Sequence, residues 1–491
     1  MKPTTVALLS AAGMLLSGVS VYSLTPTIRQ AAAASVATPE VVDPVEAPVV
    51  QAEASRFTAG GTLRLEARLG HPRLLRAEGN ETFVLLEVKG DTARKASASA
   101  PVNLSVVIDR SGSMKGGRMQ NAMNAAVGAV DRLHDGDVVS VVAFDTRAVV
   151  VVPPTTIGLG SRERVAADIR AITLGGDTCL SCGVEQAALE LDRTPGQVNR
   201  MIVLSDGDAN SGVRDLPGFR SIAQRARDRA ISITTIGVDV DYNEKILSAI
   251  SQESNGQHYF VENEASLPRV FEAEAESLTR TIASAAEATI ELPPGVELSR
   301  VYARSFRRSD GRVIIPLGTF AAGEEKTVLM KVRVPSKALG EVPIARVDLA
   351  FQDHVENKPA RCGGSLGTVV TSSPAEVVDL DPVVGARIQR SETAAALDEA
   401  NTLFLQGKAA EARRRLSSQA LALKGQDTKS KAAPAANKDL QQQLAFVDEA
   451  VTGFDAPASN EPGADPAKPQ DSRQGKGAVK QNRKRGFDLE R

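Results

Sequence analysis

The sequence predicts an α/β protein in which a doubly wound domain is inserted into a β-sandwich, followed by a helical hairpin and a disordered tail. Three observations predict this arrangement. Over residues 101–280, apolar runs of strand length alternate with helical patterns, which is typical of a parallel sheet with helices on both faces. Period-two alternation flanks that region at 56–100 and 281–380. Apolar residues recur at helical spacing over 386–452.

Length and composition limit the classes of function. The 491 residues allow two or three domains, and a hydrophobic fraction of 42% is ordinary for a globular protein. The net charge of −2 predicts no general attraction to nucleic acid or to acidic lipid. Trp is absent and aromatic residues make up 3% of the chain, which argues against stacking platforms for sugars or single strands.

The first 37 residues predict a targeting segment. Lys2 provides a positive start, residues 6–24 are apolar, and the small residues at 31–37 offer sites for a signal peptidase. A cleaved signal peptide is one outcome, and an uncleaved anchor is the other, because the apolar stretch is close to the length of a membrane span. Both predict an exported protein in the periplasm, at the cell surface or anchored and facing outward. Residues 38–55, rich in Pro, Ala and acidic residues, predict an extended linker.

The two flanks of the central region predict strands that need each other. Residues 62–67 and 83–88 alternate between apolar and polar side chains, with Gly-containing turns around them. Five further strand patterns follow the central region, at 288–292, 300–306, 312–316, 327–334 and 345–351. Because the first flank cannot form a core alone, we expect one β-sandwich built from both flanks.

Within the central region, the predicted strands lie at 102–108, 138–144, 148–152, 201–204, 231–238 and 258–261. The predicted helices lie at 118–133, 162–172, 182–191, 219–230, 243–251 and 267–279. Helical connections of this length predict parallel strands. The exception is 148–152, which a tight turn at 145–147 joins to its predecessor, so it should run antiparallel.

The C-terminal part predicts helices and then disorder. Within 386–452, the pattern over 391–424, broken at 406–408, is similar to one tetratricopeptide unit, and 440–451 offers a further helix. A single unit is too short for a solenoid. We expect a hairpin that packs on the rest of the protein or on a partner. From 453 to 491 the chain is rich in Pro, Ala, Gly and charge, which predicts disorder. Its basic cluster at 480–485 is either a solvated tail or a contact to anionic membrane or cell-wall polymer.

The most informative stretch is VNLSVVIDRSGSM at 102–114. An apolar strand ends on Asp109, and Ser111 and Ser113 follow in the pattern D-x-S-x-S before the next helix. In an open α/β sheet, ligands bind at the carboxyl ends of the strands. One carboxylate and two hydroxyls suit a divalent cation such as Mg²⁺. Taken alone, the same side chains are equally well explained as caps of the next helix.

Two further loops add small oxygen ligands. Thr178 lies in the loop LGGDTCLSCG before a helix, and Asp206 follows the apolar strand at 201–204 within LSDG. With these motifs in this order, the sequence resembles the von Willebrand factor type A domain family, a Rossmann-like fold, and its metal-ion-dependent adhesion site. The resemblance covers about residues 101–280. The later stretch LGTFAAGEEKTVLMKVRVP resembles the strand region of secreted bacterial members.

The resemblance implies roles for five residues. Ser111 and Ser113 would bind the metal directly, Asp109 and Asp206 would hold it largely through water, and Thr178 would join directly or through water. The expected ion is Mg²⁺, with Mn²⁺ or Ca²⁺ as alternatives. The remaining position would be open to an Asp or Glu of a partner protein.

Asp177 departs from the family pattern, because many relatives have a neutral residue there. It is either a further acid near the metal or a helix cap.

The three cysteines predict a disulfide. Cys179 and Cys182 form a C-x-x-C, which in a cytosolic chain would suggest redox chemistry. In an exported chain, a short disulfide that stiffens the loop beside Thr178 is favoured. Cys362 is then left over, with pairing between chains as one outcome. Two cysteines and four scattered histidines are a poor basis for a zinc site.

Two classes of function fit these features. The first is a non-catalytic, divalent-metal-dependent protein-binding module, an adhesion protein or envelope scaffold that captures a partner carboxylate. The alternative is a Mg²⁺-dependent hydrolase or phosphotransferase on a similar sheet, since Asp at a strand end can act as a nucleophile. Ser111 stands where the haloacid dehalogenase-type pattern has a second acid, and the sequence carries no phosphate-loop or G-x-S-x-G motif. We therefore predict a binding module, with no catalytic activity and no nucleic-acid partner.

Overall fold

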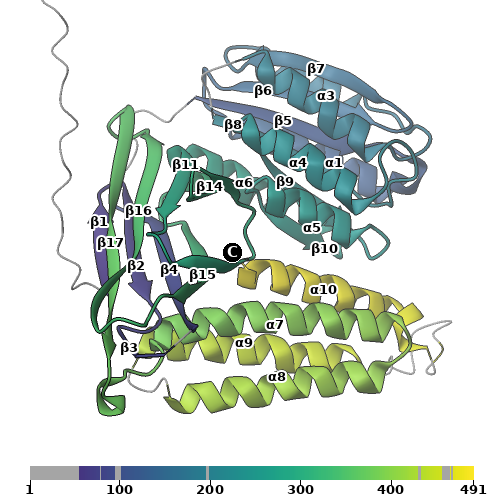
Figure 1. The fold of residues 1–491 in the computed structure, drawn as a ribbon. Coiled ribbons are helices and arrows are strands. Elements are labelled where there is room, and N and C mark those ends of the chain that lie inside the picture. The colour runs from purple at the N-terminus through teal and green to yellow at the C-terminus, as the bar shows by residue number, and fades with distance from the viewer. Residues whose placement is uncertain are drawn as a thin grey trace, which may run out of the picture. The chain divides into compact units, whose positions relative to one another are not determined.

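The computed structural model describes residues 55–77, 79–93, 101–194, 198–429, 433–455, 465 and 468–490. The predicted targeting segment lies outside these residues, and so does the predicted linker except for Ser55. The described residues form a central α/β domain, a β-sandwich and a set of C-terminal helices (Figure 1). No helix in the described ranges is long and apolar enough to span a membrane.

The central domain is built on a six-stranded sheet. Across the sheet the strands are β10 (His258–Val261), β9 (Ser232–Val238), β8 (Val198–Ser205), β5 (Val102–Asp109), β6 (Val138–Phe144) and β7 (Ala148–Thr156). All neighbours are parallel except β7, which is antiparallel to β6, so this prediction is confirmed. Every residue of β5 and of β6 is buried, as strands covered by helices on both faces require.

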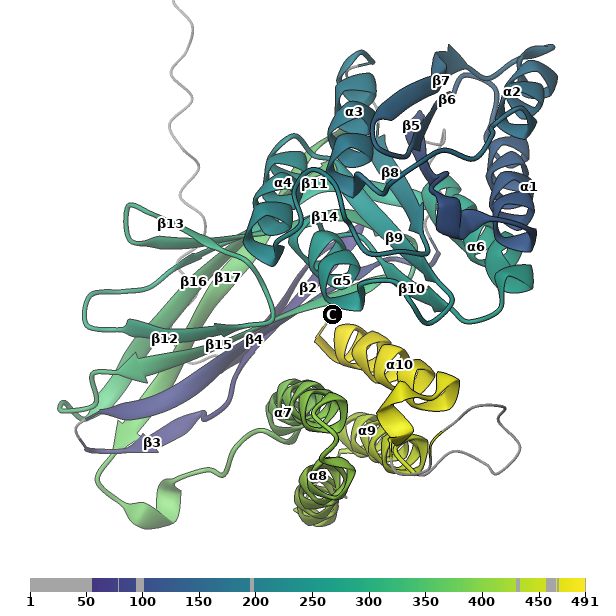
Figure 2. The ribbon, with the colours of Figure 1, turned by 90° about the vertical axis from the view of Figure 1, so that its right-hand side faces the viewer.

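Six helices cover the two faces of this sheet (Figure 2). One face carries α1 (Gly117–Asp131), α2 (Ser161–Arg170) and α6 (Leu267–Thr279), and the other carries α3 (Leu180–Asp192), α4 (Leu216–Asp228) and α5 (Glu244–Glu253). The predicted doubly wound arrangement is therefore confirmed. Gly183 lets α3 approach β6 closely, because a Cβ at this position would lie 2.6 Å from the ring of Phe144.

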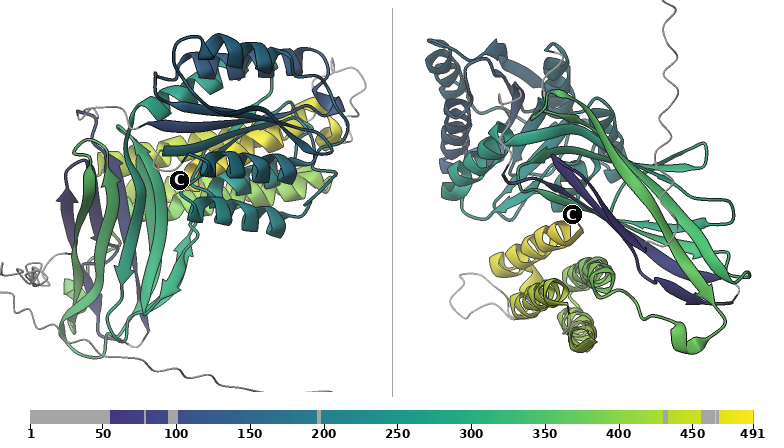
Figure 3. Two further views of the ribbon diagram at one scale, coloured as in Figure 1. Left: turned by 90° about the horizontal axis from the view of Figure 1, so that it is seen from above. Right: turned by 90° about the vertical axis from the view of Figure 1, so that its left-hand side faces the viewer.

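Two sheets form the β-sandwich, and each combines strands from before and after the central domain (Figure 3). The first sheet contains β1 (Arg56–Gly60), β2 (Leu63–Leu69), β4 (Asn80–Gly90), β15 (Glu325–Val334) and β12 (Glu297–Tyr302). The second contains β13 (Arg307–Ser309), β14 (Arg312–Ala321), β11 (Thr281–Glu291), β16 (Gly340–Asp353), β17 (Lys358–Thr371) and β3 (Arg73–Leu75). The long antiparallel pairing of β4 with β15 joins the two flanks, as the sequence predicts.

The sequence does not predict β17, one of the two longest strands of the sandwich. Its glycines and Pro359 weaken the local strand signal. The neighbouring strands explain two of these glycines. A Cβ at Gly364 would lie 2.8 Å from the ring of Phe57 on β1, and one at Gly363 would lie 2.2 Å from the carbonyl oxygen of Val347 on β16. Close packing, and not local propensity, places this strand.

The C-terminal helices are α7 (Pro382–Leu405), α8 (Ala409–Lys429), α9 (Pro434–Gly453) and α10 (Arg473–Glu490). The helices α7 and α8 form the predicted hairpin, and Gly407, with a positive φ of 79°, makes the turn between them. Asp381 caps α7 by accepting hydrogen bonds from the backbone N–H groups of Val383 and Val384. The four helices share an apolar core.

The prediction that the chain is disordered from 453 onward is wrong for α10. Val479, Phe487 and Leu489 are buried on this helix. Its basic side chains pair with acidic residues, for example Arg485 with Glu449 of α9. Composition suggested a solvated tail because these partners are remote in sequence, and the predicted basic cluster at 480–485 is part of the packed helix.

Candidate metal centre

The five predicted site residues come together at one edge of the central sheet. Asp109 is the last residue of β5 and Asp206 directly follows β8, the parallel neighbour of β5, so both carboxylates emerge at the same edge. Ser111 and Ser113 lie on the turn after β5, which contains the short 3₁₀ helix η1 (Gly112–Met114). Thr178 lies in the loop before α3.

Backbone hydrogen bonds join the three loops. The N–H of Gly175 donates to the carbonyl of Arg110 at 2.7 Å, and the N–H of Gly112 donates to the carbonyl of Gly176 at 3.1 Å. On the other side, the N–H of Asn210 donates to the carbonyl of Thr178 at 3.1 Å. The Thr178 loop is therefore fixed both to the turn after β5 and to the loop after β8.

The side chains form a continuous set of oxygen atoms. Asp109 accepts a hydrogen bond from the Ser111 N–H at 2.9 Å through Oδ1 and one from the Ser205 hydroxyl at 2.6 Å through Oδ2. The hydroxyl oxygens of Ser111 and Ser113 are 3.0 Å apart, and Ser113 donates to Oδ1 of Asp206 at 2.6 Å.

Thr178 lies close to the same oxygen atoms, in the loop before α3. A Cβ built on Gly207 would lie 3.5 Å from the Ser113 hydroxyl and 3.7 Å from the Thr178 hydroxyl. Both hydroxyls therefore lie next to Gly207, at ordinary contact distance from where its Cβ would be. The Thr178 N–H donates to Oδ1 of Asn210 at 2.8 Å, which holds the loop in this position.

This oxygen set fits a small divalent cation. Burial raises the pKa of Asp109 to about 6, hydrogen bonds from Ser111 and Ser205 oppose the rise, and the charge of Asp206 adds to it. A carboxylate in this environment is costly to ionise without a nearby positive charge, and carboxylate and hydroxyl oxygens are ligands that Mg²⁺ accepts. Groups of three or more His, Cys, Asp or Glu side chains with metal-binding geometry are absent from the described residues. The oxygen set at the sheet edge contains only two carboxylates, and its other three potential ligands are hydroxyls. It is therefore a candidate site with mixed carboxylate and hydroxyl ligands.

Sequence reasoning missed Arg118 and Asp239. Arg118, in the first turn of α1, donates to Oδ2 of Asp206 at 2.9 Å and also pairs with Asp239. Although burial opposes its charge, the two carboxylates raise the pKa of Arg118. A signal for Asp239 was present, because it directly follows the apolar strand β9 just as Asp109 ends β5. Its φ of 64° lies in the left-handed region, which is unusual for a residue other than Gly.

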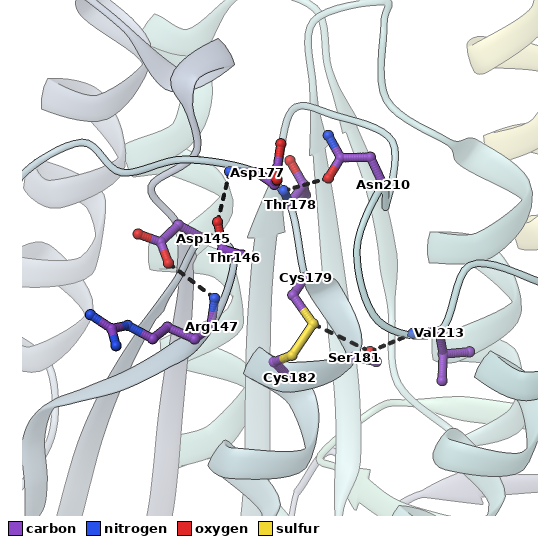
Figure 4. Close-up of a disulfide and its surroundings, with 10 residues drawn as sticks. All are labelled: Asp145, Thr146, Arg147, Asp177, Thr178, Cys179, Ser181, Cys182, Asn210 and Val213. Carbon is purple, nitrogen blue, oxygen red and sulfur yellow. Dashed lines mark hydrogen bonds between the residues drawn. A yellow bond between two sulfur atoms is a disulfide. The ribbon is translucent and has the colours of Figure 1, made fainter.

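The predicted disulfide between Cys179 and Cys182 is present, directly beside Thr178 (Figure 4). Ser181 lies between the two cysteines and accepts a hydrogen bond from the Val213 N–H at 3.0 Å. The disulfide therefore adjoins both the Thr178 loop and the loop after β8. Cys362 is unpaired in the described part of the chain, and burial raises the pKa of its thiol to about 11.

Asp177 does not occupy the capping position of α3. The N-cap residue of this helix is Cys179, and the Asp177 side chain is exposed. Its N–H donates to the hydroxyl of Thr146 at 3.2 Å, which fixes the loop through the backbone (Figure 4).

Comparison with known proteins agrees with this architecture. The family model of the von Willebrand factor type A domain matches residues 103–273. An uncharacterized protein of Synechocystis sp. is 25% identical over 267 residues, which are 52% of this chain and 62% of that protein. The uncharacterized protein YfbK of Escherichia coli is 24% identical over 270 residues, which are 52% of this chain and 46% of that protein. The matched regions thus span less than two thirds of either relative.

Solved structures share more of the fold. A von Willebrand factor type A protein from Catenulispora acidiphila superposes with a TM-score of 0.67 at 19% identity, covering 86% of this chain and 97% of that one. The ArnB paralog VWA2 from Sulfolobus acidocaldarius superposes with a TM-score of 0.52 at 18% identity, covering 79% and 98% of the two chains. The likeness therefore extends beyond the central domain, and at these identities it concerns the fold alone.

Proposed function

Because residues 103–273 of this chain form a von Willebrand factor type A domain, we propose that the protein is a non-catalytic binding module with a metal-ion-dependent adhesion site. It captures an Asp or Glu carboxylate of a partner protein through a divalent cation, Mg²⁺ in the first instance. Domains of this type commonly take part in adhesion between proteins. The observation that carries the proposal is the convergence of Ser111, Ser113 and Thr178 hydroxyls with the carboxylates of Asp109 and Asp206.

Each residue has a role that its surroundings support. Ser111 and Ser113 provide direct hydroxyl ligands, and Thr178 completes the set from the opposite loop. Asp109 and Asp206 hold the ion largely through water, and the hydrogen bonds from Ser205 and Ser113 fix the orientation of their carboxylates. A bound cation supplies Lewis acidity toward an incoming carboxylate. Ser113 is solvent-exposed, so the partner approaches from the side of this residue.

The burial of Asp109 disfavours the alternative of a hydrolase or phosphotransferase. A nucleophilic carboxylate needs an oxygen that a substrate can reach. Asp109 is fully buried, and its two oxygens accept hydrogen bonds from the Ser111 N–H and the Ser205 hydroxyl. These contacts suit a carboxylate that holds its position and does not attack a substrate.

Export is part of this proposal. It rests on the targeting segment predicted at 1–37 and on the disulfide between Cys179 and Cys182, because disulfides persist in oxidising compartments. An adhesion protein or envelope scaffold would meet its partners there.

Calorimetric titration of Mg²⁺, Mn²⁺ and Ca²⁺ into the purified protein tests the proposal. We expect saturable binding that Ser111→Ala and Asp206→Ala abolish. A matched control is Asp137→Asn, which alters a buried carboxylate at the opposite end of β5, where Asp137 accepts from the Val102 N–H at 2.9 Å. Equal metal binding by the wild type and both site variants would refute the assignment. Where the wild type binds the cation and the site variants do not, cation-dependent capture of an immobilised peptide library containing Asp or Glu tests the preference for a partner carboxylate.

A further inference from the structure

We infer that α10 is a built-in antagonist of the metal centre: while it is docked on the central domain it weakens cation binding, and cation binding in turn favours its release. This inference rests on the proposed function, because it concerns the regulation of the same site. It assigns a role to the C-terminal basic cluster, to Arg118 and to Asp239, none of which binds the cation in the proposal above.

One side of α10 carries a stripe of basic residues that faces the central domain. Its members are spaced by three or four residues, so they share one face of the helix: Arg473, Lys476, Lys480 and Lys484, followed by Phe487. The helix contacts α5 and β10 of the central domain and α7 and α9 of the C-terminal helices (Figure 2). It therefore links the two parts.

The central domain offers complementary groups to this stripe. Lys476 lies 3.1 Å from the carboxylate of Asp241. Lys480 is buried, donates to the carbonyl of Tyr242 and pairs with Glu244. At the far end, the ring of Phe487 packs edge-on against His258, with ring centres 5.9 Å apart.

The first residue of the stripe connects α10 to the metal centre. Arg473 lies 2.8 Å from Oδ1 of Asp239, and Oδ2 of the same carboxylate pairs with Arg118. Arg118 then donates to Asp206 at 2.9 Å, and Asp206 accepts from Ser113. A chain of four charged side chains thus runs from α10 to a carboxylate of the oxygen set.

The charges fix the sign of the coupling. Arg118 neutralises part of the negative charge of Asp206. A divalent cation at the oxygen set needs that negative charge. While α10 is docked, Asp239 is shared between Arg118 and Arg473. When α10 leaves, Asp239 pairs with Arg118 alone and draws its guanidinium from Asp206, and the positive charges of Arg473 and Lys476 leave this side of the domain. Both changes strengthen cation binding, and linkage requires that the cation weakens docking by the same factor.

The interface has a partly exposed end at Arg473 and Lys476 and a buried end at Lys480 and Phe487. Two cavities border it, one of about 370 Å³ between Lys476, Lys480 and residues 241–245, and one of about 610 Å³ beside Arg473, Gly477 and Phe260. Partly exposed ion pairs such as Lys476 with Asp241 contribute little free energy each. The buried pair of Lys480 with Glu244 keeps the docked state favoured, and cation binding shifts the small population of undocked α10 by the modest coupling energy that links sites in proteins.

The test uses the full chain and two readouts. Arg473→Ala removes the link while leaving the oxygen set unchanged, and the matched control Arg485→Ala removes an arginine of the same helix that pairs with Glu449 of α9. Calorimetry at low salt should give a Mn²⁺ dissociation constant about two- to fivefold lower for Arg473→Ala than for the wild type, the range for one partly exposed ion pair. The control should match the wild type.

Hydrogen exchange provides the reciprocal readout. Saturating Mn²⁺ should speed amide exchange of residues 473–490 in the wild type and leave it unchanged in Ser111→Ala. If Mn²⁺ binds to the wild type but neither its affinity in Arg473→Ala nor the exchange of α10 changes, the coupling is refuted while the metal site stands. If the wild type binds no cation, the proposed function fails and the coupling fails with it.

Discussion

Replacing Asp109 with Asn separates the free-energy cost of burying this charged carboxylate from the free energy that it gains by binding a cation. In the metal-free protein, burial raises the pKa of Asp109 from 3.8 to about 6. The native state thus holds this proton more tightly than the unfolded chain does. The native state therefore loses stability relative to the unfolded state as the pH rises from about 3.8 to about 6. Above that range, including neutral pH, the loss that this carboxyl causes is complete. The difference between the two pKa values corresponds to about 3 kcal/mol.

Asn mimics the protonated carboxyl, so in EDTA at neutral pH we expect Asp109→Asn to be more stable than the wild type. The gain should be about 2 kcal/mol, after subtracting about 1 kcal/mol for the weaker hydrogen bond with Ser205. Saturating Mg²⁺ should reverse the order, because only the wild type gains the free energy of binding, about 2.7 kcal/mol at a concentration 100 times the dissociation constant.

Urea denaturation followed by circular dichroism measures both differences. The comparison is made in EDTA and in Mg²⁺, at neutral pH and near pH 4, where the advantage of the variant in EDTA should vanish. A variant that is less stable than the wild type in metal-free solution at neutral pH would refute the reasoning, because the buried charge would then be compensated by the protein itself.

Three further predictions follow from other parts of the structure. Replacing Cys179 and Cys182 together with Ser should cost about 2 kcal/mol and weaken Mg²⁺ binding, because the disulfide adjoins the threonine loop; calorimetry that finds an unchanged affinity would contradict this. Gly364→Ala should destabilise the protein by about 1–3 kcal/mol, since a methyl group there would lie 2.8 Å from an aromatic ring of β1; an unchanged urea midpoint would show that β1 does not pack there. Burial lowers the pKa of His258 to about 3, so the contribution of its neutral ring to stability is fully present above pH 6.5. This contribution is lost as the pH falls, by about 2 kcal/mol at pH 5. A His258→Gln variant whose stability depends on pH as the wild type's does would show that His258 does not cause the loss.

The central domain could be predicted from the sequence because its signals are local. Each parallel strand is an apolar run of its own, each helix has its own periodicity, and the turn at 145–147 is short enough to fix the direction of β7. Asp109 and Asp206 could be placed together because both follow neighbouring parallel strands. The loop before a helix offered Thr178 as a further hydroxyl, but its role at the metal depended on the family resemblance, since nothing local shows that this loop lies next to Gly207.

The missed features depend on partners that are remote in sequence. Arg118 reads as an ordinary residue of an exposed helix start, and only the fold places it between Asp206 and Asp239. The helix α10 has the composition of a solvated tail, and its acceptors on the central domain lie more than 200 residues earlier, as with Lys480 and Glu244, which are 236 residues apart. Ion pairs between residues so far apart in the chain leave no signal in the local sequence pattern.

The most direct test of the central claim is anomalous diffraction from crystals of the protein grown with Mn²⁺. The account predicts one strong peak at the carboxyl edge of the central sheet, within bonding distance of the Ser111 and Ser113 hydroxyls, and its loss in crystals of Ser111→Ala. A Mn²⁺ peak elsewhere with none at this edge would contradict the account, and the oxygen set would then be a structural feature of the three loops.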